Sequence, residues 1–410
     1  MKLALVSAKF PFGGKEPYLH AELRALAPYF DGITVFPTSP SERTRGFDDI
    51  AADVERLGLF SIGTARDALL ALLTRPRASL GAIARLLGAR YGIKAKLKNA
   101  AVVPLGLALG HRLRRGGFDH VHAYWLSTPA SVAYLAAQVA GIPWSATGHR
   151  WDIYENNALA LKLRSARFVR AISARGRADM IAALGARGGD ARVEVVHVGV
   201  ALPPSPQSPQ SPQSPQSPQS SATARPFALL CAANLFVTKG HRDLLDALAV
   251  LRGRGVVVHC TIAGDGTLRD ELHARAAELQ LGEYVTFRGH VAHAALLDEI
   301  AAGAYDAMIL PSIELPGGLM EGIPVALMEA MARGLPVITT ATGSITELVD
   351  ERCGRVVPQR SAELLADAVA ELAADPPLRA HLAAAALAKI SNEFDVVPLA
   401  ATLAALIRDR

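Results

Sequence analysis

The sequence predicts an α/β protein of two doubly wound domains joined by a proline-rich linker. Three observations predict it: the chain has 410 residues, short Val/Ile/Leu runs alternate with helical patterns in both halves, and a Ser-Pro-Gln repeat interrupts the middle. Apolar strands separated by helices are typical of parallel sheets covered on both faces. Because such sheets bind ligands outside the carboxyl ends of their strands, we expect the two domains to face each other across a cleft.

The linker is the clearest boundary in the chain. From Ser205 to Gln219 the tripeptide Ser-Pro-Gln repeats five times. Proline at every third position excludes a helix or a central strand, so we expect an extended tether of about 3.1 Å per residue. The predicted organisation is a first domain at 1–202, the linker at 203–224, a second domain at 225–392, and a C-terminal helix at 393–410 that is able to pack back on the first domain.

The strand predictions follow the apolar runs of each half. In the first domain we expect strands at Lys2–Ala8, Gly32–Pro37, His120–Leu126, Arg167–Ser173 and Val193–Val200. In the second we expect Phe227–Leu235, Val256–Gly264, Tyr284–Gly289, Tyr305–Pro311, Pro336–Thr340 and Gly354–Pro358.

Composition and cysteine usage narrow the class of protein. Half of the residues are hydrophobic and 20% are charged, which allows sizeable cores. The three cysteines are widely spaced and form no CxxC pair, so the sequence supports neither a disulfide framework nor a zinc site. We expect a reduced, cytoplasmic compartment. The cysteines are Cys231, Cys260 and Cys353.

No segment has the pattern of a membrane span or a signal peptide. The N-terminal apolar run is short and lacks a small-residue cleavage site, so it is expected to form the first strand. The long uncharged stretch Ala123–Gly148 is interrupted by Pro129, Pro143 and several polar residues. It is therefore expected to belong to a globular core.

A basic segment concentrates the positive charge of the first domain. Between Arg66 and Arg115 there are eleven Lys or Arg residues and one acid, Asp67, with leucines and alanines interleaved. An apolar helix face flanked by cations suits an anionic membrane surface. The alternative is a solvated helix pair with an ordinary basic exterior. Nucleic acid is disfavoured because no aromatic platform accompanies the charge.

The residues from Pro311 to Gly334 carry the most chemical information. Pro324 suits the first position of a helix and Gly334 the position after its end, which predicts a helix of about ten residues. Glu321 then lies in the loop that enters the helix. Glycines before the helix leave backbone N–H groups open, and a helix start favours a phosphate. Glu329 has apolar neighbours, so its carboxylate needs a partner. The glycines are Gly317, Gly318 and Gly322.

The segment EGIPVALMEAMARGLPVI, with Glu321 and Glu329 separated by seven residues, resembles the signature of glycosyltransferase family 4, retaining enzymes of the GT-B fold. The resemblance implies an N-terminal acceptor-side domain and a C-terminal domain that binds a nucleotide sugar. It implies that Glu321 contacts the transferred sugar and Glu329 the ribose. It also implies that the backbone of Gly322, Ile323, Pro324 and Val325 holds the diphosphate and sugar.

Two further loops of the second domain resemble the same family. In AANLFVTKGHRDLL, Lys239 matches the lysine that reaches the donor diphosphate, whereas Asn234 stands where many members have arginine. Neutralisation of the phosphates then rests on Lys239 and the helix dipole. Residues Gly289, His290 and Val291 resemble the loop that binds the nucleotide base.

The first domain contributes a glycine pair and a histidine. Gly13 and Gly14 follow the first strand and resemble the loop that approaches the diphosphate and the acceptor, although a plain tight turn is the alternative. His149 follows another strand end, where family members have a histidine that touches the sugar. His122 and Asp152 are further candidates beside it, and His197 is expected in the core or between the domains.

The resemblance implies a retaining hexosyl transfer from a nucleotide diphosphate sugar, which is a substrate rather than a cofactor. The chain has no Asp-x-Asp, so the sequence indicates no metal-bridged diphosphate, and cationic groups must stabilise the leaving nucleotide. The basic segment favours a lipid-linked glycan acceptor in bacterial exopolysaccharide or lipopolysaccharide synthesis, with the protein peripheral on the inner face of the membrane. The alternatives are a non-catalytic nucleotide-sugar-binding module and a GT-B nucleotide-sugar epimerase.

Overall fold

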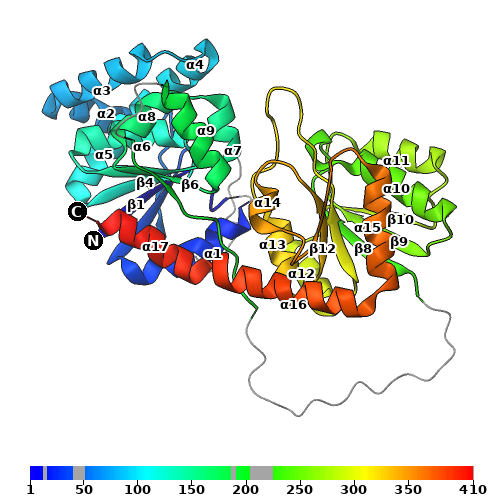
Figure 1. Cartoon of the computed structure of the whole chain (residues 1–410). Coiled ribbons are helices and arrows are strands. Elements are labelled where there is room, and N and C mark those ends of the chain that lie inside the picture. Colours follow the sequence, from blue (N-terminus) through cyan, green and yellow to red (C-terminus); the bar gives the residue numbers. More distant parts are fainter. Residues whose placement is uncertain (13–15, 40–50, 186–190, 204–224, 410) are drawn as a thin grey trace. The chain divides into compact units, whose positions relative to one another are not determined.

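The computed structural model describes residues 1–12, 16–39, 51–185, 191–203 and 225–409. The chain divides into two compact units, coloured along the sequence in Figure 1. Unit 1 comprises Met1–Gly199 and Val396–Arg410, and unit 2 comprises Val200–Asp395. Most of the predicted linker, residues 204–224, lies outside the described residues.

Unit 1 is built on a sheet of seven strands, all paired in parallel, in the order β3-β2-β1-β4-β5-β6-β7. The strands are β1 (Lys2–Ser7), β2 (Gly32–Pro37), β3 (Asp53–Val54), β4 (His120–Ala123), β5 (Trp144–Gly148), β6 (Phe168–Ala171) and β7 (Val193–Val195). The central strand β1 is buried along five of its six residues, which requires cover on both faces.

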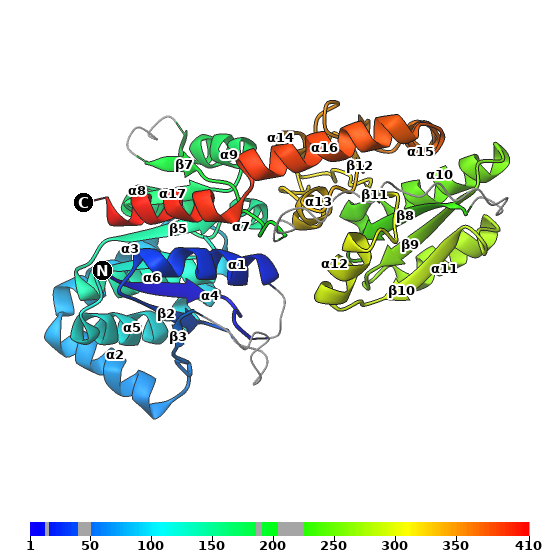
Figure 2. The ribbon, with the colours of Figure 1, turned by 90° about the horizontal axis from the view of Figure 1, so that it is seen from below.

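Helices supply that cover for unit 1. They are α1 (Pro17–Leu26), α2 (Ile62–Thr74), α3 (Pro76–Gly88), α4 (Ile93–Ala101), α5 (Val103–Gly116), α6 (Thr128–Ala140), α7 (Arg150–Glu155), α8 (Leu159–Ser165), α9 (Ala174–Leu184) and α17 (Val396–Arg408), with the 3-10 turn η1 (Ala27–Tyr29). The C-terminal helix α17 lies beside α1 (Figure 2). Its Leu403 and Ile407 share one apolar cluster with Leu19 and Leu23.

Unit 2 has a second parallel sheet, in the order β10-β9-β8-β11-β12-β13. Its strands are β8 (Phe227–Ala232), β9 (Val258–Ala263), β10 (Val285–Gly289), β11 (Ala307–Leu310), β12 (Val337–Thr340) and β13 (Arg355–Val357). Its helices are α10 (His241–Gly253), α11 (Arg269–Glu278), α12 (His293–Ala301), α13 (Val325–Met331), α14 (Ile345–Leu348), α15 (Ala362–Ala374) and α16 (Pro376–Glu393), with the 3-10 turn η3 (Val237–Lys239).

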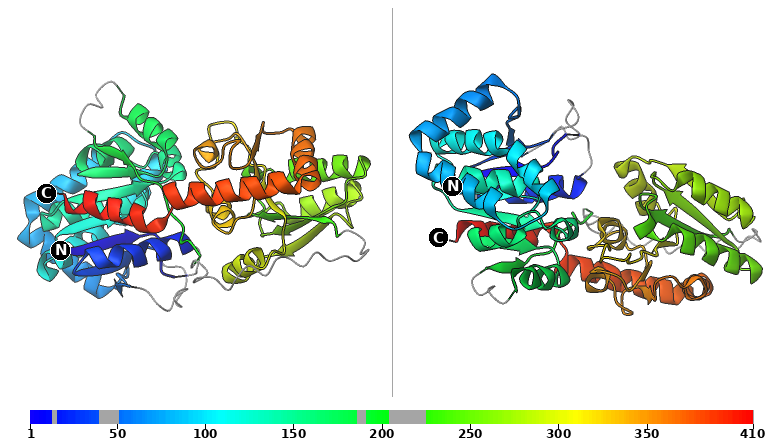
Figure 3. Two further views of the ribbon diagram at one scale, coloured as in Figure 1. Left: turned by 60° about the horizontal axis from the view of Figure 1, so that its bottom comes forward. Right: turned by 90° about the horizontal axis from the view of Figure 1, so that it is seen from above.

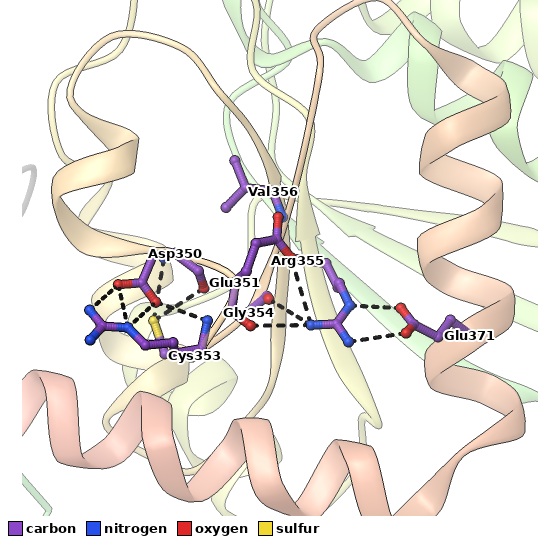
Figure 4. Close-up of polar contacts among 8 residues, drawn as sticks. Asp350, Glu351, Cys353, Gly354, Arg355, Val356 and Glu371 are labelled. Carbon is purple, nitrogen blue, oxygen red and sulfur yellow. Dashed lines mark hydrogen bonds and ion pairs between the residues drawn. The ribbon is translucent and has the colours of Figure 1, made fainter.

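The edge strand β13 is fastened to α15 by a two-pronged ion pair. Arg355 Nε lies 2.7 Å from Glu371 Oε2, and Arg355 Nη2 donates to Glu371 Oε1 at 3.0 Å (Figure 4). The paired N–H groups of a guanidinium match the two oxygens of a carboxylate, so the pair fixes orientation as well as distance. The pair therefore sets how α15 covers the end of the sheet.

The two parallel sheets confirm the predicted α/β fold, and the strands differ from the predictions mainly at their carboxyl ends. The strand predicted at His120–Leu126 ends at Ala123, and the one predicted at Val193–Val200 ends at Val195. Two strands lie outside the predicted strand ranges: β3 has only two residues, and β5 carries the small and polar residues Ser145, Ala146 and Thr147.

Candidate functional site

Within unit 2, the loops after β8 and β11 meet at one end of the sheet. These strands are neighbours at the centre of the strand order, and the chain leaves β8 toward β9 on one side and β11 toward β12 on the other. Such a reversal at the carboxyl ends of parallel strands is where ligands of doubly wound sheets bind.

The loop after β8 is held against the loop after β11. Ile313 N donates to Thr238 O at 2.9 Å. Gly240 has φ +69, and a Cβ at this position would lie 1.8 Å from Pro311 O, so only glycine allows this approach. A cavity of about 390 Å³ opens beside this contact, with Gly240, His241 and Ile313 in its lining.

Lys239 and Glu321, two predicted site residues, form an ion pair at this junction. Lys239 Nζ lies 2.9 Å from Glu321 Oε1, and the two side chains are 20% and 15% exposed. Lys239 ends the turn that follows β8, and Glu321 belongs to the loop that follows β11. The fold thus joins a cation and a carboxylate that are far apart in the sequence.

The helix after Glu321 begins later and is shorter than predicted. Pro324 is its N-cap, with ψ 119, and α13 has seven residues rather than about ten. Because Pro324 has no N–H, the backbone N–H groups that a ligand could reach at the helix start belong to the residues on either side of Pro324. The backbone N–H groups of Gly322, Ile323 and Val325 donate no hydrogen bond to any other residue that the structure describes.

Glu329 has the partner that its apolar surroundings require. His293 Nε2 lies 2.7 Å from Glu329 Oε1, and Arg333 Nη1 donates to the carbonyl oxygen of Glu329 at 3.1 Å. The hydrogen bond to Glu329 raises the pKa of His293 above its ordinary value, against the effect of burial. Sequence reasoning missed His293 because the pairing joins α12 to α13 and leaves no local pattern.

The other predicted donor-side residues line the same end of the sheet. Asn234 is exposed in the loop after β8, and its carbonyl oxygen accepts from Phe236 N at 2.8 Å. Gly289 ends β10 with φ +63, and its carbonyl oxygen accepts from Gly264 N at 2.8 Å. His290 is exposed and Val291 is half-buried.

In unit 1, His149 follows β5 as the N-cap residue of α7 and contacts Trp125, which in turn contacts Glu16. Sequence reasoning missed both Trp125 and Glu16. The rings of Trp125 and His149 stack with their centroids 4.0 Å apart at 28°. Trp125 Nε1 donates to Glu16 Oε1 at 3.1 Å. Burial raises the pKa of the Glu16 carboxyl. The signals available in the sequence were a carboxyl two residues after the glycine pair and an aromatic residue after an apolar strand.

Asp152 and Lys162 brace the loop that carries Trp125. The buried Asp152 carboxylate accepts from His149 N and from Ser127 N, each at 3.0 Å. The ammonium of Lys162, also fully buried, donates to Leu126 O at 2.6 Å and to Ser127 O at 2.7 Å. Burial lowers the pKa of Lys162 to about 7. Both side chains therefore act on the backbone beside the His149 ring.

The remaining predictions for unit 1 concern His122, His197 and the glycine pair. His122 lies inside β4, where its ring nitrogens pair with Ser145 Oγ at 2.7 Å and Thr147 Oγ1 at 2.9 Å, which accounts for it as a core residue. His197 Nδ1 lies 2.9 Å from Ile172 O. Gly13 and Gly14 lie outside the described residues.

Among the described residues, no three His, Cys, Asp or Glu side chains gather as a possible metal site. Within the same residues, no helix combines the length and the apolar character that crossing a bilayer requires.

The sequence is similar to known proteins over part of its length. Residues 213–389 match the family model described as Glycosyl transferases group 1. The chain is 33% identical over 192 residues to the putative colanic acid biosynthesis glycosyltransferase WcaL of Salmonella typhimurium, covering 46% of each protein. It is 34% identical over 178 residues to the amylovoran biosynthesis glycosyltransferase AmsK of Erwinia amylovora, covering 42% of each. The chain thus spans about half the length of the curated relatives it matches.

The fold is similar to solved structures over nearly the whole chain. The Anabaena protein Alr3699/HepE, solved in complex with UDP, superposes with a TM-score of 0.71 at 22% identity, covering 98% of each chain. At that identity the likeness concerns the fold alone, and it confirms the GT-B fold that the sequence predicts.

Proposed function

We propose that the chain is a retaining glycosyltransferase of the glycosyl transferases group 1 family, whose model matches residues 213–389. The proposed reaction moves a hexose from a nucleotide diphosphate sugar to a glycan or lipid-linked acceptor. Relatives named for colanic acid and amylovoran biosynthesis favour a role in bacterial exopolysaccharide assembly, with lipopolysaccharide assembly as the related possibility.

The pairing of Lys239 with Glu321 beside open backbone amides carries the proposal. A pyrophosphate needs cations and N–H donors, and a sugar needs groups that accept hydrogen bonds from its hydroxyls. Lys239 and the amides of Gly322, Ile323 and Val325 offer the first kind of group, and Glu321 offers the second. These groups lie together at the reversal point of the sheet.

Each group then has a distinct role in the transfer. Lys239 and the amides stabilise the charge that develops on the departing diphosphate. Glu321 and His149 position the sugar, and Glu329 holds the ribose hydroxyls with the carboxylate that His293 also contacts. The acceptor hydroxyl attacks from the face that the diphosphate leaves, and its proton passes to the departing phosphate oxygen, so the anomeric configuration is retained.

Nucleotide release measured with a panel of UDP and GDP sugars and a lipid-extract acceptor tests the proposal. We expect Lys239→Met and Glu321→Gln each to lower turnover by about 100-fold, the usual effect of removing one charge-stabilising group. Lys389→Met and Glu393→Gln are matched controls, because Lys389 and Glu393 form a Lys–Glu pair at 2.6 Å on α16. Full turnover in both site variants would contradict the proposal.

The same assay separates the alternatives. A nucleotide-sugar-binding module binds the donor and releases no nucleotide. An epimerase alters the donor without an acceptor. Product linkage analysed by NMR distinguishes retention from inversion, and activity that survives chelation supports transfer without a metal.

A surface of unit 1 supports peripheral binding to an anionic membrane as part of this function. The helices α2, α3 and α4 gather on one side of unit 1 (Figures 1 and 3). They expose large apolar side chains among their cations. On α2, Ile62, Leu69 and Leu73 share one stripe, since they are spaced seven and four residues apart. This α2–α4 surface comprises those residues with Leu80, Ile93, Leu97, Arg66, Arg75, Arg77, Arg90, Lys94, Lys96 and Lys98.

A further inference from the structure

Three side chains from neighbouring strand ends of unit 1 meet in one cluster. Glu16 follows β1, Trp125 follows β4 and His149 follows β5, and these strands are adjacent in the sheet. Trp125 joins the other two, because its ring stacks on His149 and its Nε1 donates to Glu16 Oε1. A carboxylate, an imidazole and an indole at adjacent carboxyl strand ends form a candidate ligand site.

Three polar atoms of this cluster have no hydrogen-bond partner in the described part of the chain. They are Glu16 Oε2, His149 Nδ1 and His149 Nε2, and none exposes appreciable surface. His149 Nδ1 faces the first turn of α7, where Asp152 Oδ2 lies 3.7 Å away. Buried polar groups are nearly always paired in folded proteins, so two that face one cluster call for an explanation.

We propose that Glu16, Trp125 and His149 form a binding site for the hydroxyl groups of a sugar ring. A hydroxyl donates a hydrogen bond to Glu16 Oε2, and an oxygen of the same sugar accepts one from His149 Nε2. This inference rests on the proposed glycosyl transfer and adds Glu16 and Trp125 to its site.

Trp125 is the group that uncovers the site. Its side chain is half-buried and contacts both Glu16 and His149, so one displacement of the indole exposes Glu16 Oε2 and His149 Nε2. The sugar hydroxyl then donates a hydrogen bond to Glu16 Oε2, and the sugar ring packs against the displaced aromatic face. Glu16 Oε2 and His149 Nε2 then both have a partner.

The surroundings of Glu16 suit a strong hydrogen-bond acceptor. Burial raises the pKa of Glu16, while His149, the Trp125 N–H, the backbone of Phe10 and Lys9 oppose the rise. Tyr18 also lies near, with its ring centroid 6.3 Å from that of His149. A partly desolvated carboxylate among few positive charges binds a neutral hydroxyl more strongly than a solvated one does.

The sugar that occupies the site belongs either to the donor or to the acceptor, and kinetics with Glu16→Gln distinguishes them. Glutamine keeps an oxygen for the Trp125 N–H, so a merely structural Glu16 tolerates the change. With a donor sugar in the site, we expect the donor KM to rise by about 10- to 100-fold and the rate of acceptor-independent donor hydrolysis to fall by a similar factor. With an acceptor sugar in the site, only the acceptor KM rises, and the rate of donor hydrolysis is unchanged.

Tryptophan fluorescence provides a second readout, titrated with UDP-glucose, GDP-mannose, UDP and GDP. A donor sugar in the site changes the emission on binding of a nucleotide sugar but not of the nucleotide alone, and Trp125→Phe abolishes that change. Wild-type turnover with unchanged KM values in both Glu16→Gln and Trp125→Phe would overturn this inference and leave the proposed function standing. No wild-type turnover with any donor would overturn the proposed function and this inference with it.

Discussion

Lys239 Nζ lies 2.9 Å from Glu321 Oε1, and both side chains are largely shielded from water. The carboxylate therefore neutralises the lysine before any substrate binds. In the proposed function, a donor diphosphate would compete with Glu321 for this ammonium, and the released carboxylate would then accept hydrogen bonds from the sugar. On that proposal, the ion pair links diphosphate binding to the availability of Glu321.

Glu321→Gln should separate nucleotide binding from transfer. Without the competing carboxylate, Lys239 is available to the diphosphate, so we expect UDP or GDP to bind about 3- to 10-fold more tightly, whereas turnover falls. Isothermal titration with the nucleotide measures the first effect and nucleotide release the second. Weaker nucleotide binding by Glu321→Gln would show that the pair organises the site instead of competing with the ligand.

Gly240→Ala should disrupt the same site through the backbone. Residue 240 has φ +69, and the new methyl group would meet Pro311 O at 1.8 Å, so the two loops must separate. We expect a loss of about 2–4 kcal/mol in the free energy of unfolding and a parallel loss of turnover. Gly253→Ala is the control, because nothing lies within 4 Å of its added Cβ. Equal denaturant midpoints for the two variants would contradict this account.

The strands could be predicted from sequence because their Val, Ile and Leu runs are buried on both faces. Their carboxyl ends were predicted too far along the chain, since Tyr124 and Leu126 are buried after β4 has ended and prolong the apolar run. The strand β5 lay outside the predicted ranges because its small polar residues lack that pattern. The strand β3 has only two residues, which are too few to form a recognisable apolar pattern.

The local part of the candidate site could also be predicted, whereas its pairings could not. The order of glycines, Glu321 and Glu329 is a local pattern in the sequence. The contact of Lys239 with Glu321 and the contact of His293 with Glu329 each depend on which strand ends become neighbours. Strand order is a tertiary property, so no local pattern encodes these distances.

The His293–Glu329 pair should contribute a small, pH-dependent stabilisation. The folded pKa of His293 is raised, so the contribution is fully present below the unfolded value of about 6.5 and is lost as the pH rises through the folded value. Because His293 is 45% exposed, we expect His293→Gln to cost less than about 1 kcal/mol at pH 5.5 and almost nothing at pH 8.5. Urea unfolding at both pH values measures this. His381→Gln, an exposed site on α16, is the control, and a cost independent of pH would contradict the assignment.

The α2–α4 surface should bind vesicles that contain anionic lipid. We expect Leu73→Gln combined with Leu97→Gln to weaken binding to phosphatidylglycerol vesicles by about 10-fold, and Lys94→Gln to weaken it by about 5-fold. Leu387→Gln on α16 is the control, because this leucine is exposed in unit 2. Co-sedimentation gives the partition coefficient. Equal sedimentation with phosphatidylcholine vesicles, or no effect of the leucine changes, would exclude an electrostatic lipid surface here.

Lys162 should make the stability of unit 1 depend on pH in the alkaline range. Its folded pKa of about 7 lies below the ordinary value of 10.5, so the folded chain binds fewer protons than the unfolded chain between these values. The free energy of unfolding therefore rises with pH across this interval, by up to about 5 kcal/mol from this residue alone. Below pH 7 both states are protonated and the rise is absent.

Lys162→Arg and Lys162→Met test this from two sides. Arginine stays charged throughout, and methionine carries no charge, so both variants should lose the part of the slope between pH 7 and 10 that the wild type has. Methionine also leaves Leu126 O and Ser127 O without their donor, so the loop that carries Trp125 should loosen. We expect Lys162→Met to lower turnover in proportion to this change, with the Trp125 emission as an independent readout. An identical pH slope in wild type and both variants would show that the pKa of Lys162 is not lowered in the folded protein, which would contradict this prediction.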